Sequence, residues 1–330
     1  MSQSPIFIGG MQRSGTSLMR SMIGSHPAVA IFQWDLPIWT KIYPVFQHVS
    51  TGGKQLCDAV LDAFFASNKV KNCDMQLDRD RVRIRALSVK PVDFANIAEA
   101  FLSEYAELVG RPRWGLKTPQ NEFYAEQIFS AYEDARMIQL VRDPRDCSLS
   151  VQNYDEKWAQ NYDAVEHAQT WRQSVKLGLK YQNQFAGRYL VIKYEDLVRD
   201  PENSVRRACE TLDLEFQPEM LSMNGHLGWR GNSSSFNQHE PKEKKISTES
   251  IGRYQQQSSD FDLRLYQTIL QDELRTLGYA IDPERTSLPR HIQFAIKAEK
   301  ILQGSIFERH ASKLRRHVIR RVRQSTSKAA

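Results

Sequence analysis

The stretch PIFIGGMQRSGTSLMR, residues 5–20, determines the fold of this 330-residue chain. Residues 5–9 form an apolar run without alternation, which is typical of a strand buried on both faces. From Leu18 onward, apolar side chains recur at helical spacing. A strand that turns through Gly, Ser and Thr into a helix points several backbone N–H groups at one spot, beside the positive end of the helix dipole. The stretch therefore predicts an anion-binding loop at the carboxyl end of the first strand.

Further apolar runs predict three more buried strands, at residues 114–117, 137–141 and 189–194. The clearest helical patterns are residues 56–65, 94–109, 164–185 and 263–277. Strands separated by helices indicate an α/β fold, here a P-loop-like three-layer fold with a central, mostly parallel sheet flanked by helices. Residues 35–110 have helical patterns and no strand pattern, so we expect them to form an insertion over one end of the sheet.

The basic charge of the chain is concentrated in its C-terminal tail. The formal net charge is +6, and residues 301–330 hold eight Lys and Arg residues against one Glu. The near-neutral remainder argues against nucleic acid as a partner. We therefore divide the chain into a main domain, residues 1–283, and a basic, helical tail, residues 284–330.

The pattern of the tail indicates a surface-binding helix. From Lys313, the apolar residues Leu314, Val318 and Val322 recur every four positions among arginines. A narrow apolar stripe with a broad cationic face is typical of helices that lie on a surface. The predicted partner is an anionic membrane surface or an acidic protein, and a solvated C-terminus is the alternative.

Other sequence features bear on location and metal binding. No apolar run approaches the roughly 18 residues of a membrane span. Residues 1–5 resemble no secretory signal, and the four cysteines have no metal-ligand spacing. We expect a cytoplasmic protein with reduced thiols and no metal, and any membrane attachment would be peripheral.

The loop shares part of a nucleotide-binding motif. Gly10 and Gly15 have the spacing of the outer glycines in the P-loop, G-x-x-x-x-G-K-[ST]. Thr16 stands in the Lys position, however, and the basic residue is Arg13, inside the loop. This departure weakens the interpretation as an ATP-dependent phosphotransferase, which remains the alternative function. A nucleotide-binding protein without catalysis is a third.

The segment QRSGTS, residues 12–17, followed by SHP, residues 25–27, resembles the 5′-phosphosulfate loop of sulfotransferases. That loop typically reads P-R-S-G-T-[ST] with an H-P downstream, and Gln12 replaces the commoner Pro. The resemblance is nearest to the branch of protein-tyrosine sulfotransferases and their bacterial relatives. It implies transfer of a sulfuryl group from 3′-phosphoadenosine 5′-phosphosulfate (PAPS) to a hydroxyl or amine by in-line displacement. The product of the donor would be 3′-phosphoadenosine 5′-phosphate (PAP), and no metal would be required.

Four later segments resemble other motifs of the same family. WGLKTP at 114–119 is similar to the strand end whose Lys meets the sulfuryl group, and VRDPRDCSLS at 141–150 to the 3′-phosphate motif. YEDL at 194–197 resembles an element that approaches the nucleotide, and NSSSF at 232–236 with IGR at 251–253 resembles a late loop over the phosphates. Each segment alone would also suit a helix cap or a solvated strand end.

The resemblance implies a donor site, with particular residues in it. They are Arg13, Ser14, Gly15, Thr16, Ser17, Arg142, Ser150, Tyr194 and one of Ser233, Ser234 and Ser235, of which we choose Ser234.

The resemblance also implies catalytic roles. Arg13 and Lys117 would neutralise charge that develops on the transferring group. The acceptor needs a base, which in the protein-tyrosine branch is a Glu shortly after the H-P element. Gln33 and Trp34 occupy the corresponding positions here, and Asp35 follows. We therefore predict that Asp35 is the base, although it would also suit a helix cap.

Alternatives for the base are His48, Glu122 and His239. The insertion at residues 35–110 would line the acceptor cleft. Its aromatic residues have helical spacing and indicate core packing, so the acceptor stays open between a peptide, a glycan, a lipid head group and a small metabolite.

Overall fold

We describe a computed structural model of the protein, which covers residues 4–49, 53–153, 162–223 and 246–302. The chain divides into two compact units, one of residues 1–142 and 176–248 and the other of residues 143–175 and 249–330. In the part of the chain that is described, no helix is long and apolar enough to cross a membrane.

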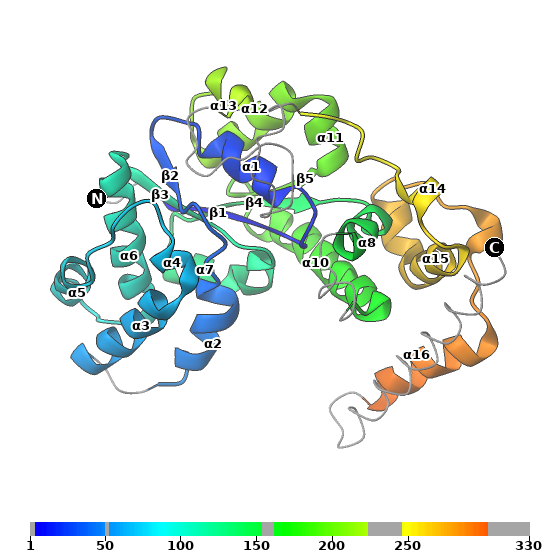
Figure 1. The fold of residues 1–330 in the computed structure, drawn as a ribbon, viewed down its shortest axis with the longest axis horizontal. Coiled ribbons are helices and arrows are strands. Elements are labelled where there is room, and N and C mark those ends of the chain that lie inside the picture. Colours follow the sequence, from blue (N-terminus) through cyan, green and yellow to red (C-terminus); the bar gives the residue numbers. More distant parts are fainter. Residues whose placement is uncertain (1–3, 50–52, 154–161, 224–245, 303–330) are drawn as a thin grey trace. The chain divides into compact units, whose positions relative to one another are not determined.

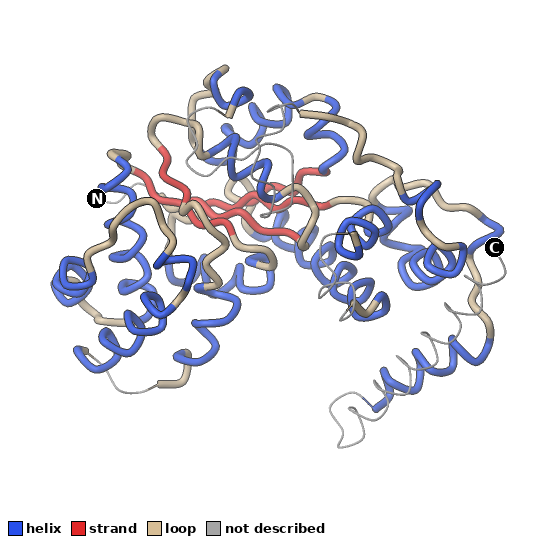
Figure 2. The backbone as a smooth tube through the Cα atoms, in the orientation of Figure 1, coloured by secondary structure: helices blue, strands red, loops and turns tan. Residues whose placement is uncertain are grey.

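The first unit is built on five parallel strands in the order β2-β3-β1-β4-β5. These are β1 (Ile6–Gly10), β2 (Val29–Ile31), β3 (Arg113–Lys117), β4 (Arg136–Val141) and β5 (Tyr189–Lys193). Figure 2 shows the strands in red with helices on both sides. The predicted α/β three-layer fold is confirmed, and the sheet is wholly parallel. The four predicted strands are present, but β2 was not predicted.

Helices on both faces of the sheet complete the three layers (Figure 1). On one face, α1 (Thr16–Ile23) contacts β1, β2 and β3, while α12 (Pro201–Leu212) contacts β4 and β5. On the other face, α6 (Phe94–Val109) packs on β2 and β3, and α7 (Ala125–Ala131) adds to the same core. The unit also contains η2 (Asn121–Tyr124), α11 (Tyr194–Arg199) and α13 (Glu219–Ser222). The carboxyl ends of all five strands consequently meet at one edge, where ligand sites of such sheets lie.

The described residues of the predicted insertion form helices joined by short loops, with no strand among them. After the π-helix η1 (Ile38–Ile42) come α2 (Tyr43–Phe46), α3 (Lys54–Ala66), α4 (Asn68–Lys71), α5 (Arg79–Ser88) and then α6. Its aromatic side chains Trp39, Phe64 and Phe101 are buried in one cluster with Phe7 and Trp114 of the sheet. The insertion is therefore part of the core of the first unit, and these aromatic residues are packing residues.

Within its described residues, the second unit contains helices and no strand. They are α8 (Pro144–Gln152), the first part of α10 (Ala164–Gln184), α14 (Tyr254–Gln257), α15 (Asp260–Thr276), η3 (Pro283–Arg285) and α16 (Arg290–Leu302). Helix α16 lies inside the predicted helical tail, but the basic residues from Arg309 onward lie outside the described residues.

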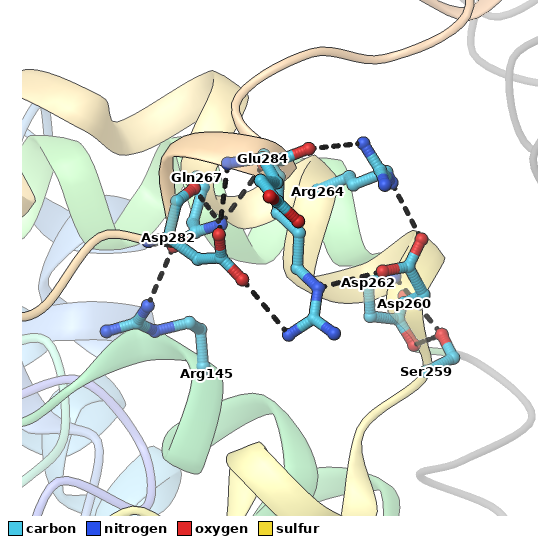
Figure 3. A network of polar contacts seen from close by, with 9 residues as sticks. Arg145, Ser259, Asp260, Asp262, Arg264, Gln267, Asp282 and Glu284 are labelled. Atoms are coloured by element: carbon cyan, nitrogen blue, oxygen red, sulfur yellow. Dashed lines mark hydrogen bonds and ion pairs between the residues drawn. The ribbon is translucent and has the colours of Figure 1, made fainter.

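Arg145 belongs to a polar network within the second unit, part of which is drawn in Figure 3. The buried guanidinium donates two hydrogen bonds to the Asp143 carboxylate, at 2.9 and 2.6 Å, and one to the Gln267 side chain at 3.3 Å. Gln267 in turn accepts from the Asp282 backbone at 2.7 Å. Asp143 is also the N-cap of α8, because its carboxylate accepts from the Arg145 backbone at 3.0 Å. Arg145 therefore has a structural role in the motif at 141–150.

A buried histidine makes the second unit sensitive to acid. His167 Nδ1 lies 2.8 Å from the Tyr266 hydroxyl, and burial lowers the pKa of His167 to about 4. The unfolded chain takes up this proton near pH 6.5, whereas the folded chain resists it until about pH 4. Between those values the unfolded state binds more protons, so stability decreases as the pH falls.

We predict that substituting His167→Gln removes most of this acid sensitivity, since an amide can still accept from Tyr266 but does not titrate. Between pH 7.5 and pH 5, the wild type should lose about 2 kcal/mol of unfolding free energy relative to the variant. Denaturant unfolding at the two pH values measures the difference. Equal losses in both proteins would contradict the assignment.

Candidate active site

The anion-binding loop between β1 and α1 depends on left-handed backbone at three positions. Gly10 has φ +123°, Gly15 has φ +94°, and Arg13 has φ +69°, which is uncommon for a residue with a side chain. Ser14 fixes the curve from inside, because its backbone N–H and its hydroxyl both donate to the Met11 carbonyl, at 3.2 and 2.6 Å. Gly15 is the N-cap of α1, so the first-turn N–H groups of that helix face the loop. The predicted strand, turn and helix are confirmed.

Two residues that directly follow strands contact the loop, Tyr194 after β5 and Arg142 after β4. A Cβ atom on Gly15 would lie 2.4 Å from the Tyr194 ring, so only glycine fits against this tyrosine. The Arg142 guanidinium lies over the same ring at 4.5 Å from its centroid, and its NH1 donates to the Arg13 carbonyl at 2.9 Å. Arg142 directly follows β4, as predicted. Two predicted donor-site residues thus contact the loop from neighbouring strand ends.

Lys117 brings a third cation to the loop. It is the last residue of β3 and is 1% exposed. Its Nζ lies 3.0 Å from the Ser17 hydroxyl of α1 and 2.6 Å from Asp35 Oδ1. The same Asp35 oxygen lies 3.5 Å from the buried Arg20 guanidinium of α1, and the Asp35 side chain is 34% exposed. Lys117 and Arg20 therefore hold the Asp35 carboxylate in place, while part of its side chain remains accessible to solvent.

The surroundings of Lys117 and Asp35 shift both of their pKa values. Burial lowers the pKa of Lys117 to about 8, against the opposing effect of the Asp35 carboxylate, and the charges of Arg20 and Arg13 add to the decrease. Burial alone would raise the pKa of Asp35, but the charges of Lys117 and Arg20 outweigh it and hold that pKa below its usual range. Asp35 is consequently ionised at neutral pH, and Lys117 is mostly charged at pH 7 but loses its proton at mildly alkaline pH.

Most of the predicted site residues come together in the first unit. These are Arg13, Ser14, Gly15, Thr16, Ser17, Lys117, Asp35, Arg142 and Tyr194. Ser150 lies on α8 in the second unit, so its predicted pairing with Arg142 on one phosphate stays a prediction. Ser234 and its neighbours Ser233 and Ser235 lie outside the described residues.

Residues 251–253, part of the predicted late loop over the phosphates, are held against α8 within the second unit. Both carboxylate oxygens of the buried Asp146 accept backbone N–H groups there, from Gly252 at 2.7 Å and from Tyr254 at 3.0 Å. Arg253 lies between these two anchored residues. The segment is thus attached to α8 on both sides of an arginine.

The three alternative bases have different surroundings. His48 is exposed after α2, and His239 lies outside the described residues. Glu122 is fully buried in η2, where Oε2 accepts the Gly10 N–H at 2.7 Å. Sequence reasoning did not predict this loop contact, nor the contact of Arg20 with Asp35. The helical spacing from Thr16 to Arg20 was a possible signal for Arg20, but no pattern links residue 122 to residue 10.

Comparisons with known proteins show the family of the chain. A profile of the sulfotransferase family matches residues 5–218, which is more than half of the chain. Protein-tyrosine sulfotransferase A of Caenorhabditis elegans is 25% identical over 232 residues, covering 68% of this chain and 53% of that protein. The chain therefore spans about half the length of this relative.

Two solved structures share the fold. The sulfotransferase domain from the curacin biosynthetic pathway matches with a TM-score of 0.57 and 20% identity, over 84% of this chain and 99% of that one. The sulfotransferase domain of the Synechococcus PCC 7002 olefin synthase matches with a TM-score of 0.52 and 21% identity, over 85% and 97% of the two chains. Because the family profile spans the loop, Lys117, Arg142 and Tyr194, the chain belongs to the sulfotransferase family.

Proposed function

We propose that this sulfotransferase takes its sulfuryl group from PAPS and transfers it to a hydroxyl or amine, releasing PAP. The observation that carries the proposal is the buried Lys117 ammonium, 3.0 Å from Ser17 at the start of α1. A cation with 1% exposure beside a helix N-terminus is costly to bury, and its ion pair with Asp35 at 2.6 Å offsets that cost only in part, so an anion bound at the loop would stabilise it further. Arg142 and Arg13 add positive charge at the same loop.

The loop fits the phosphosulfate end of PAPS. Glycine at position 15 lets Tyr194 and the loop backbone approach closely, and the first-turn N–H groups of α1 are donors for an anion. Thr16 and Ser17 would add hydroxyl donors at this end, and the planar Arg142 guanidinium is suited to the 3′-phosphate of the same donor. When bound, PAPS supplies an activated sulfuryl group whose bond to the 5′-phosphate oxygen breaks as the bond from sulfur to the acceptor forms.

Asp35 and Lys117 would act as a coupled pair. Asp35 accepts the proton of the acceptor hydroxyl, which becomes acidic as its oxygen bonds to sulfur, so a weakly basic carboxylate suffices. Once Asp35 carries that proton, it no longer neutralises Lys117. The full charge of the Lys117 ammonium then becomes available to the oxygen that leaves the sulfuryl group. The 2.6 Å contact of the two side chains supports this coupling.

The proposed donor is tested by calorimetric titration with PAP, ATP and Mg-ATP. We expect PAP to bind more tightly than ATP with or without Mg²⁺, because Thr16 replaces the Lys of the ATP-binding motif. Tighter binding of ATP would favour the phosphotransferase alternative and overturn the proposal.

The pKa of Lys117 predicts an alkaline limb in the pH profile. Lys117 carries its charge below its pKa of about 8, so kcat/KM, which reports the free enzyme, should fall above that pH. In Lys117→Arg the guanidinium stays charged, and we expect a lower rate without this limb between pH 7 and pH 10. The control is Lys180→Arg, at an exposed lysine paired with Glu126, which should keep the wild-type profile. A limb that persists in Lys117→Arg would assign the titration to another group.

Removing the proposed base should affect both rate and pH dependence. We predict that Asp35→Asn lowers kcat by about 10²-fold or more, which is typical for loss of a general base. Because the Asp35 charge raises the pKa of Lys117, the alkaline limb should also move to lower pH. Asp58→Asn breaks the ion pair with Arg83 in the insertion and is the matched control. Turnover of Asp35→Asn within a few-fold of the wild type would pass the role of base to His48, Glu122 or His239.

A further inference from the structure

Glu122 is a buried carboxylate that contacts the start of the anion-binding loop. It lies on η2, five residues after Lys117, and is 0% exposed. Its Oε2 accepts the backbone N–H of Gly10, the last residue of β1, at 2.7 Å. A bond of this length from an N–H to a carboxylate is a charge-assisted hydrogen bond, which is stronger than one between neutral groups.

The two glycines at the end of β1 make this contact possible. A Cβ atom on Gly9 would lie 2.8 Å from Glu122 Oε2, so a side chain there would displace the carboxylate. A Cβ atom on Gly10 would lie 2.3 Å from the Leu140 carbonyl, and the φ of +123° favours glycine on its own account. The Gly9-Gly10 pair therefore admits Glu122 on one side and β4 on the other.

A carboxylate is not suited to bind an anionic donor, because like charges repel. Its contact with Gly10 instead occupies a backbone N–H at the point where strand becomes loop. The other charged contacts lie further along, where Arg142 donates to the Arg13 carbonyl at 2.9 Å and Lys117 contacts Ser17 at 3.0 Å. The loop is thus attached at its beginning, its middle and its end, each time to a charged side chain.

We propose that Glu122 is a positioning residue that holds the anion-binding loop in its binding conformation before the donor arrives. The attachment at Gly10 fixes the direction in which the chain leaves β1. The N–H groups at the start of α1 then need no rearrangement to receive a phosphate, and a preformed site avoids the cost of ordering the loop on binding. The proposal rests on the proposed function for its ligand, but not for its structural effect on the loop.

The neighbouring Asn121 provides a matched control. It is also 0% exposed and lies on the same short helix. Its Nδ2 donates to the Ile8 carbonyl in the middle of β1, at 3.1 Å, and not to the loop. Asn121→Ala should therefore lower stability without changing the loop, whereas loss of the Glu122 contact should change the loop itself.

The experiment compares the wild type with Glu122→Met, Glu122→Asp, Glu122→Gln and Asn121→Ala in the full chain. Met fills similar space without an acceptor, Asp keeps the charge but withdraws it from Gly10, and Gln keeps an acceptor at the same reach. Two readouts are taken well below the melting temperature. One is the Kd for PAP by calorimetry, and the other is amide hydrogen exchange of residues 10–17 without ligand.

We expect Glu122→Met and Glu122→Asp to weaken PAP binding about tenfold or more, as for loss of a charge-assisted hydrogen bond, and to speed exchange in the loop. The Kd of Glu122→Gln for PAP should stay within a few-fold of that of the wild type. Asn121→Ala should match the wild type in both the Kd and the loop exchange. If the Glu122→Met variant does not fold, the Glu122→Asp variant alone tests the proposal.

Unchanged loop exchange in both Met and Asp variants, or equal effects of Asn121→Ala, would overturn the proposal. Failure of the wild type to bind PAP would instead count against the proposed donor. In that case the exchange of residues 10–17, which requires no ligand, still decides the role of Glu122.

Discussion

The contact of the Lys117 ammonium with Ser17 and Asp35 is the interaction on which the site depends. It joins the end of β3, the start of α1 and the segment after β2 through one buried cation. Burying a lysine costs free energy that Asp35 offsets only in part, because Arg20 and Arg13 add positive charge nearby. A bound anion would complete the balance. The positive charges around Lys117 therefore favour the binding of an anion at the loop.

We propose different roles for the two carboxylates near the loop, proton transfer for Asp35 and positioning of the loop for Glu122. Asp35 is one-third exposed and its Oδ1 lies 2.6 Å from Lys117 Nζ, so in the proposed function it exchanges a proton with the acceptor. Glu122 is wholly buried and its Oε2 accepts the backbone N–H of Gly10, so we propose that it holds the chain. Two acidic residues near one loop can therefore have different roles because their exposure differs.

Much of this architecture could be predicted from sequence because its signals are local. The apolar runs of four strands and the glycine-rich turn are short continuous patterns, and the helix at 94–109 was predicted with the bounds that the structure has. Strand β2 was missed because three residues, 29–31, are too few to show a pattern beside the preceding H-P turn. The pairing of Glu122 with Gly10 joins residues 112 positions apart, and only the sheet brings them together. Local sequence patterns do not indicate which distant residues come into contact.

A crystal structure of the protein with PAP tests the central claim most directly. We expect the 5′-phosphate to lie on the loop at residues 13–17, within hydrogen-bond distance of Lys117 Nζ and the first-turn N–H groups of α1. PAP bound away from this loop, or bound with Lys117 still contacting only Asp35 and Ser17, would contradict it.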